Sequence, residues 1–174
     1  MTSGRTRGRL VPALLAATVG IVAAAAATVA YGITDSAISD GAPVAMAESH
    51  SMMEDEVVDI ANRKRAEAGC EPLFVDERLD NAAEAHSRDM ARRDYFDHTT
   101  PEGVTFRDRI QTAGFANPGT GENIARGLPD AKQVMASWMA SEEHRSNILN
   151  CEFSYVGIGL DEDGMYWTQD FGKA

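Results

Sequence analysis

The chain has 174 residues, a net charge of −11 at pH 7 and two cysteines. This length allows one domain with a substantial core, plus an N-terminal extension. Nucleic-acid binding is not expected, because no basic stripe is present to neutralise phosphates. The short basic run 63–65 has acidic neighbours and is expected to lie on a solvated helix face.

The first 47 residues differ in composition from the rest. A head with three arginines precedes an apolar run from Leu10 to Tyr31, and small residues follow around Ala47. This order is typical of a secretory signal peptide cleaved after Ala47. The alternative is an uncleaved membrane anchor, because about 20 apolar residues can span a bilayer. Both interpretations place residues 48–174 outside the cytoplasm, either secreted or tethered to the outer face of the cytoplasmic membrane.

Helical patterns dominate the first part of the 48–174 domain. Ser51 and Glu54 have the spacing of a capping box, which predicts a helix that starts at Ser51 and ends at Gly69. Periodic apolar positions and capping residues predict three further helices, at about 76–94, at 105–113 and from about 130.

Strand patterns follow the helices. Val156, Ile158 and Leu160 alternate with smaller or polar residues, and a turn at 161–164 leads into a returning strand over 165–171. The segment 121–127 could supply a third strand. Helices followed by an antiparallel sheet predict an α+β domain over residues 48–174.

The two cysteines are Cys70 and Cys151. In an oxidising compartment an isolated pair more often forms a disulfide than a reactive site. A catalytic thiol would need electropositive surroundings, yet a glutamate follows each cysteine. We therefore expect a structural disulfide between them.

Three dispersed side chains are the candidates for chemistry: His98, Glu122 and His144. They are separated by 24 and 22 positions, so only tertiary structure could bring them together. Two imidazoles and a carboxylate suit a divalent, zinc-like ion, or a general acid and base. Each residue also has a purely local explanation, as a loop histidine bonded to backbone, a capping glutamate and a surface histidine. His86 shares a helical face with apolar residues and is expected to be a core histidine.

Five ordered motifs resemble the CAP superfamily (cysteine-rich secretory proteins, antigen 5 and pathogenesis-related 1 proteins), also called the SCP domain, and in particular its bacterial secreted branch. The resemblance runs from about Val57 to Phe171. Its motifs are the segments Ala85–Met90, Tyr95–Gly103, Gly121–Ala125, Trp138–Leu149 and Tyr166–Gly172. It implies an α-β-α sandwich, in which a small antiparallel sheet lies between helical layers.

The resemblance also implies a central cavity with two His and two Glu, which holds a divalent metal in some members. His98, Glu122 and His144 match three of these positions, and Ser141 replaces the second Glu. Bacterial relatives commonly have Ser-Pro-Gly-His where this chain has Ser-Glu-Glu-His, so the rim of the cavity is more acidic here. The two glutamates, 142 and 143, are expected to raise the pKa of His144.

The function that we expect is a secreted or surface-tethered binding module whose His/Glu cavity holds a divalent cation such as zinc. The first alternative is a metal-dependent hydrolase acting on peptides or cell-envelope material, and the second is a structural partner-binding domain with a vestigial site. The expected partners are a small hydrophobic ligand, a peptide or a cell-envelope component. A membrane is expected as a partner only if the N-terminal segment is uncleaved.

Overall fold

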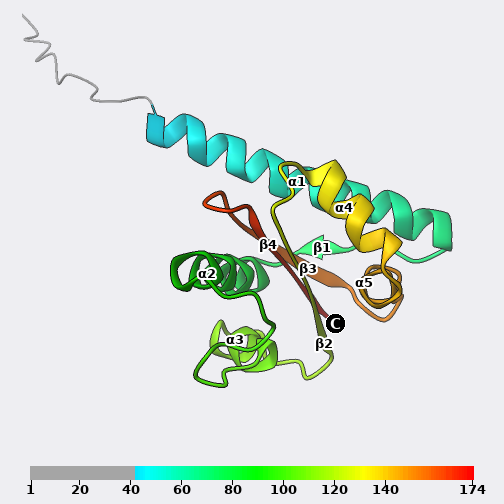
Figure 1. Cartoon of the computed structure of the whole chain (residues 1–174). Coiled ribbons are helices and arrows are strands. Elements are labelled where there is room, and N and C mark those ends of the chain that lie inside the picture. The colour runs from blue at the N-terminus through cyan, green and yellow to red at the C-terminus, as the bar shows by residue number, and fades with distance from the viewer. Residues whose placement is uncertain (1–41) are drawn as a thin grey trace, which may run out of the picture. The chain divides into compact units, whose positions relative to one another are not determined.

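The computed structural model describes residues 42–174, with side chains from residue 52 onward (Figure 1). Five helices and four strands follow in the order α1 (Ala42–Ala68), β1 (Phe74–Val75), α2 (Glu77–Arg93), α3 (Phe106–Thr112), β2 (Thr120–Arg126), α4 (Ala131–Ala140), α5 (Glu142–Ile148), β3 (Tyr155–Asp161) and β4 (Tyr166–Gly172). No helix in this part of the chain is both long and apolar enough to cross a membrane. The export segment from Leu10 to Tyr31 lies outside the described residues.

Three of the predicted helix starts are confirmed by their caps. Asp76 accepts a hydrogen bond from the backbone N–H of Arg78 at the start of α2, and Asp130 accepts one from Gln133 at the start of α4. Thr105 forms a capping box with Asp108 at the start of α3. These side chains satisfy N–H groups that have no partner within the helix.

The predicted start of the first helix is wrong. α1 begins at Ala42, because the residues before Ser51 are mostly good helix formers such as Ala, Met and Glu. Ser51 and Glu54 therefore both lie inside α1 and do not mark its start. The carboxylate of Glu54 accepts a hydrogen bond from the backbone N–H of Leu160 in β3, at 3.1 Å, and so links α1 to the sheet. The expected cleavage point after Ala47 falls within α1, and cleavage there stays a prediction.

The four strands form one sheet in the order β1-β3-β4-β2. The strands β2, β4 and β3 are antiparallel, as expected. The two-residue strand β1 adds a parallel edge beside β3, which is too short to leave a pattern in the sequence. Strand β2 forms the other edge.

Helices cover both faces of the sheet: α2 and α3 lie on one side, and α1, α4 and α5 lie on the other (Figure 1). Gly157 and Gly159 let the backbone of α2 lie directly on β3, since a Cβ atom on Gly159 would come within 2.2 Å of the Glu84 nitrogen. Trp138 and Trp167 are fully buried in the cluster between the sheet and α1 and α4. The predicted α+β class and α-β-α sandwich are confirmed.

The end of α1 is fastened to the segment before β3. Cys70 and Cys151 form the predicted disulfide, with their Cα atoms 5.0 Å apart. Arg65 lies beside it and is fully buried, so the expected solvated face is wrong at this position. Its guanidinium is satisfied by four backbone carbonyls at 2.8–3.0 Å, those of Glu71, Ile148, Asn150 and Phe153. A buried cation without such acceptors would be strongly destabilising.

Candidate functional site

The site begins with His98, in the loop that joins α2 to α3. Asp97 accepts a hydrogen bond from the N–H of Thr99, at 2.8 Å, which fixes the backbone on one side of His98. The carbonyl of His98 accepts a hydrogen bond from Arg109 of α3, at 3.0 Å. The loop is therefore anchored on both sides of the imidazole.

Glu122 of β2 connects this loop to the sheet. Its Oε1 lies 2.7 Å from Nδ1 of His98, and its Oε2 lies 2.5 Å from Nη2 of Arg109. The side chain of Glu122 is completely buried and that of Arg109 is 10% exposed, whereas that of His98 is 46% exposed. Because a carboxylate only accepts, Nδ1 of His98 carries the proton in this bond. In the neutral ring, Nε2 then keeps its lone pair for a ligand.

The bond to Glu122 also sets the charge of His98. The hydrogen bond to the Glu122 carboxylate raises the pKa of His98 above its usual value, and burial opposes this only in part. The charged imidazolium is therefore favoured over a wider pH range than in a free histidine.

Asp170 of β4 pairs with Glu122 across the two strands, on the face covered by α2 and α3. Asp170 is fully buried, and neither carboxyl oxygen has a hydrogen-bond partner in the part of the chain that the structure describes. Burial, followed by the charge of Glu122, raises the pKa of Asp170 well above its usual range. Burial therefore favours the neutral acid at Asp170, whereas Glu122 is held by His98 and Arg109.

His144 approaches from the opposite helical layer, near the start of α5. Asn123 of β2 donates to the carbonyl of His144 at 3.2 Å, and Asn147 of α5 donates to the carbonyl of Glu122 at 3.1 Å. These two amides fasten α5 to β2, so the two histidines come from layers that meet at this edge of the sheet.

The net shift of the His144 pKa is opposite to the expected one, although Glu143 acts in the expected direction. The pKa of His144 is lowered by burial and by the charge of His98, and Glu143 opposes this only in part. Ser141, Glu142, Glu143 and Ser146 line a polar hollow at the start of α5.

The structure joins His98 directly to Glu122, and it places His144 near enough for its pKa to depend on the charge of His98. Across the described residues, no three His, Cys, Asp or Glu side chains are grouped around one point as ligands for an ion. Metal binding by His98, Glu122 and His144 stays a prediction.

Two ionisable members of the site, Arg109 and Asp170, were not predicted from the sequence. Asp170 is the only acidic residue in the predicted strand over 165–171, and its place between aromatic residues is a signal that the sequence contains. Arg109 left no such signal, because α3 carries a second arginine at 107 and the sequence does not distinguish between them.

His86 is confirmed as a core histidine. It is fully buried in α2, and its Nε2 donates to the carbonyl of Asp97 at 3.0 Å. Burial lowers the pKa of His86 to about 4, so the ring is neutral at pH 7. Its bond to Asp97 supports the loop next to His98, which makes it a supporting residue of the site.

Comparison with known proteins agrees with this fold. Residues 58–171 match the model of the CAP family, described as the cysteine-rich secretory protein family. The chain belongs to this family. The matched range 58–171 includes the segments that carry His98, Glu122, His144 and Asp170.

Bacterial relatives show the same relationship. The chain is 42% identical over 123 residues to the YkwD protein of Bacillus subtilis, covering 71% of this chain and 48% of that protein. It is 32% identical over 120 residues to the membrane protein YlbC of the same organism, covering 69% of this chain and 34% of that protein. This chain thus matches less than half the length of either relative.

A solved structure agrees as well. An extracellular protein of Bacillus anthracis that contains an SCP domain superposes with a TM-score of 0.72 at 30% identity, covering 78% of this chain and 45% of that protein. A cysteine-rich secretory protein of Staphylococcus aureus has a TM-score of 0.64 at 20% identity, covering 73% of this chain and 40% of that protein. The second likeness is one of fold alone.

Proposed function

We propose that the protein is an exported binding module whose site, formed by His98 and His144, takes a divalent cation such as zinc. The observation that carries this proposal is the buried Glu122 carboxylate, held by Arg109 and bonded to Nδ1 of His98. Histidines that bind metals commonly donate their other ring N–H to a carboxylate, which fixes the tautomer and the ring orientation. Two imidazole nitrogens are also donors that zinc prefers.

In this proposal Glu122 orients His98 and is not itself a ligand, because both of its carboxylate oxygens are already engaged. With only two protein ligands, positions on the ion remain for water or for a bound molecule. The cation is therefore expected to be exchangeable. Its role would be to hold a ligand that supplies the missing donor atoms.

The loop that carries His98 also indicates the kind of ligand. Phe96 and Val104 belong to this loop and are 41% and 40% exposed. Arg126 of β2 lies over the Phe96 ring, at 5.3 Å from its centre. Exposed apolar side chains beside a polar centre fit a ligand with an apolar part and a donor group, such as a peptide, a small hydrophobic ligand or a cell-envelope component.

Export is supported by three observations. The N-terminal extension has the order of a signal peptide or anchor. The bond between Cys70 and Cys151 is typical of oxidising compartments. The Bacillus anthracis relative is an extracellular protein. Mass spectrometry of the exported protein would separate secretion from tethering, since a tethered protein keeps Leu10–Tyr31.

Calorimetric titration of the full chain with zinc tests the site. We expect His98→Ala and His144→Ala each to weaken zinc binding strongly, and Glu122→Gln to weaken it by about 10–100-fold, the usual effect of losing the partner of a metal-binding histidine. Glu84→Gln is the control, because it removes one exposed carboxylate of α2 away from the site.

Acidification is a second part of the same experiment. Zinc must displace the proton of His98, whose pKa is raised, so binding should weaken as the pH falls towards and below that value. If both histidine variants bind zinc as well as the parent, or if the parent binds none, the proposal is refuted. The second result would favour a structural partner-binding domain.

Hydrolysis is the second candidate function, since a histidine oriented by a buried carboxylate is also the arrangement of a general base. Incubation with peptides and envelope material, with and without zinc, tests it. Cleavage that disappears in His98→Ala would establish a hydrolase. Binding of zinc without cleavage would favour the binding module.

A further inference from the structure

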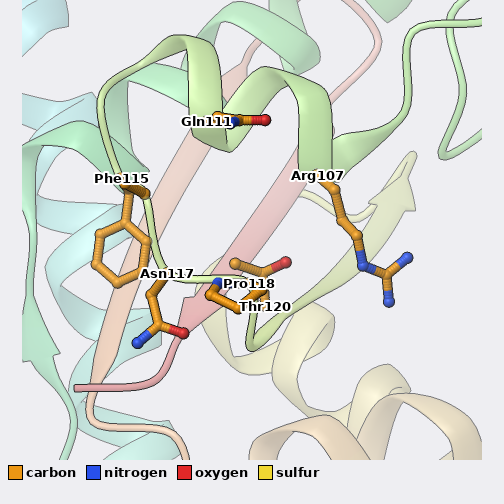
Figure 2. Close-up of a pocket in the computed structure, with 7 residues that line it drawn as sticks. Arg107, Gln111, Phe115, Asn117, Pro118 and Thr120 are labelled. Atoms are coloured by element: carbon orange, nitrogen blue, oxygen red, sulfur yellow. The ribbon is translucent and has the colours of Figure 1, made fainter.

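A second concave site lies between α3 and the segment that leads into β2. Figure 2 shows Arg107 and Gln111 projecting from α3 above this hollow, with Phe115 and the segment up to Thr120 around it. Its volume is about 180 Å³. The residues that line it and matter here are Arg107, Gln111, Phe115, Asn117, Pro118 and Thr120.

Arg107 stands out among the cations around this segment. Arg78 is paired with Asp76 at 2.6 Å, and Lys173 is paired with Glu152 at 2.6 Å. Among residues 52–174, the guanidinium of Arg107 has no carboxylate partner, and its contact is the ring of Phe106, with 4.6 Å between Cζ and the ring centre. In a chain with a net charge of −11, this cation at the edge of a hollow remains open to an anion.

Of the other polar side chains that line the hollow, Asn117 is hydrogen-bonded to the backbone, whereas Thr120 and Gln111 can bond a ligand. The Asn117 amide accepts from the N–H of Gly119 and donates to the carbonyl of Ala174, both at 2.9 Å, so it holds the segment in shape. The hydroxyl oxygen of Thr120 is buried and has no partner within the described range. The Gln111 side chain is exposed and offers both a donor and an acceptor.

Size and charge together limit the ligand. Pockets that take drug-sized molecules have volumes of about 300–1,000 Å³, so this one suits a group the size of a single amino-acid residue. A single guanidinium balances a single negative charge, and its planar fork matches the two oxygens of a carboxylate. A phosphate dianion would call for a second unpaired cation.

We propose that this hollow binds the terminal carboxylate of a small ligand, such as the last residue of a short peptide. Arg107 binds the carboxylate, and the Gln111 amide bonds the neighbouring peptide group. Thr120 and Glu122 lie on the same face of β2, about 7 Å apart along the strand. The hollow is thus next to the site at His98, but it requires no metal, so it goes beyond the cation site proposed above.

Titration of the zinc-free full chain with N-acetylalanine and with N-acetylalaninamide, followed by calorimetry or amide NMR shifts, tests the proposal. We expect saturable binding of the acid with a dissociation constant of about 1 mM, the range of a few directed contacts, and no binding of the amide. Arg107→Gln should weaken binding about tenfold or more, the effect of one charge-assisted contact.

Arg63→Gln is the matched control, because it removes the same charge from α1 on the other face of the sheet. Equal binding of acid and amide, equal weakening by the two arginine variants, or no saturable binding by the parent would each overturn the proposal. Zinc titration of Arg107→Gln separates the two sites, since we expect this variant to bind zinc as the parent does. Failure at one site therefore leaves the other site testable.

Discussion

The pair of carboxyls at the centre of the site provides the most informative test of its electrostatics. Arg109 is almost completely buried, and its charge is balanced by Glu122 at 2.5 Å. Removing one partner of a buried ion pair usually costs about 3–5 kcal/mol. In Glu122→Gln, however, the negative charge that helps to keep Asp170 neutral is gone. Asp170 can then ionise and balance Arg109 in its place.

Three variants separate these effects. Asp170→Asn replaces a neutral acid by a neutral amide of similar shape, so we expect a loss of about 1 kcal/mol or less. Glu122→Gln should cost about 2 kcal/mol, because Asp170 compensates in part. The double variant leaves Arg109 without a carboxylate and should cost about 4–5 kcal/mol. The loss in the double variant should therefore exceed the sum of the single losses by about 1–2 kcal/mol.

Urea unfolding at pH 7 with the disulfide intact measures these free energies, with the fluorescence of the two buried tryptophans as the probe. The reasoning is refuted if the two substitutions are additive within about 0.5 kcal/mol. It is also refuted if Asp170→Asn alone costs as much as Glu122→Gln, since Asp170 would then be ionised in the parent.

Three further predictions concern the fold. Gly159→Ala should cost about 3 kcal/mol or more in urea unfolding, because its Cβ would meet the backbone of α2. Gly119→Ala should cost less than about 1 kcal/mol, because the atoms nearest to its Cβ belong to the flexible side chain of Lys173. Reducing the Cys70–Cys151 bond should lower the free energy of unfolding by about 4 kcal/mol, because the bond closes a long loop; an unchanged urea midpoint would contradict this. The pKa of His86 is lowered from 6.5 to about 4, so between these pH values the imidazole is protonated in the unfolded state but not in the folded state. The free energy of unfolding should therefore fall by about 3 kcal/mol as the pH falls from 6.5 to 4. His86→Gln should remove this part of the pH dependence.

The elements that could be predicted from the sequence are those with a local signal. The caps at Asp76, Thr105 and Asp130 act on N–H groups two or three residues away, so their geometry is contained in the sequence. The alternation of apolar and polar residues after residue 153 likewise predicts β3 and β4. The start of α1 was mispredicted because a plausible capping box lies inside a longer run of helix formers.

The site was predictable only in part, because its members meet through tertiary structure. Sequence motifs identified His98 and Glu122 as candidate site residues. The hydrogen bond between them depends on how the loop after α2 lies against β2, which the motifs do not specify. The partners Arg109 and Asp170 are set by helix position and by strand register, which one sequence does not reveal. The burial of Arg65 depends in the same way on carbonyls more than 80 residues away.

The edge position of β2 has a mechanical consequence for any ligand that reaches both histidines. His98 belongs to the layer of α2 and α3, whereas His144 belongs to the layer of α4 and α5, and β2 has a strand neighbour only on its β4 side within the described sheet. A ligand that binds both imidazoles would link the two helical layers across this edge of the sheet. The binding free energy of this ligand would oppose local unfolding of β2. Slower hydrogen exchange of the β2 amides would therefore show that the ligand is bound to both histidines.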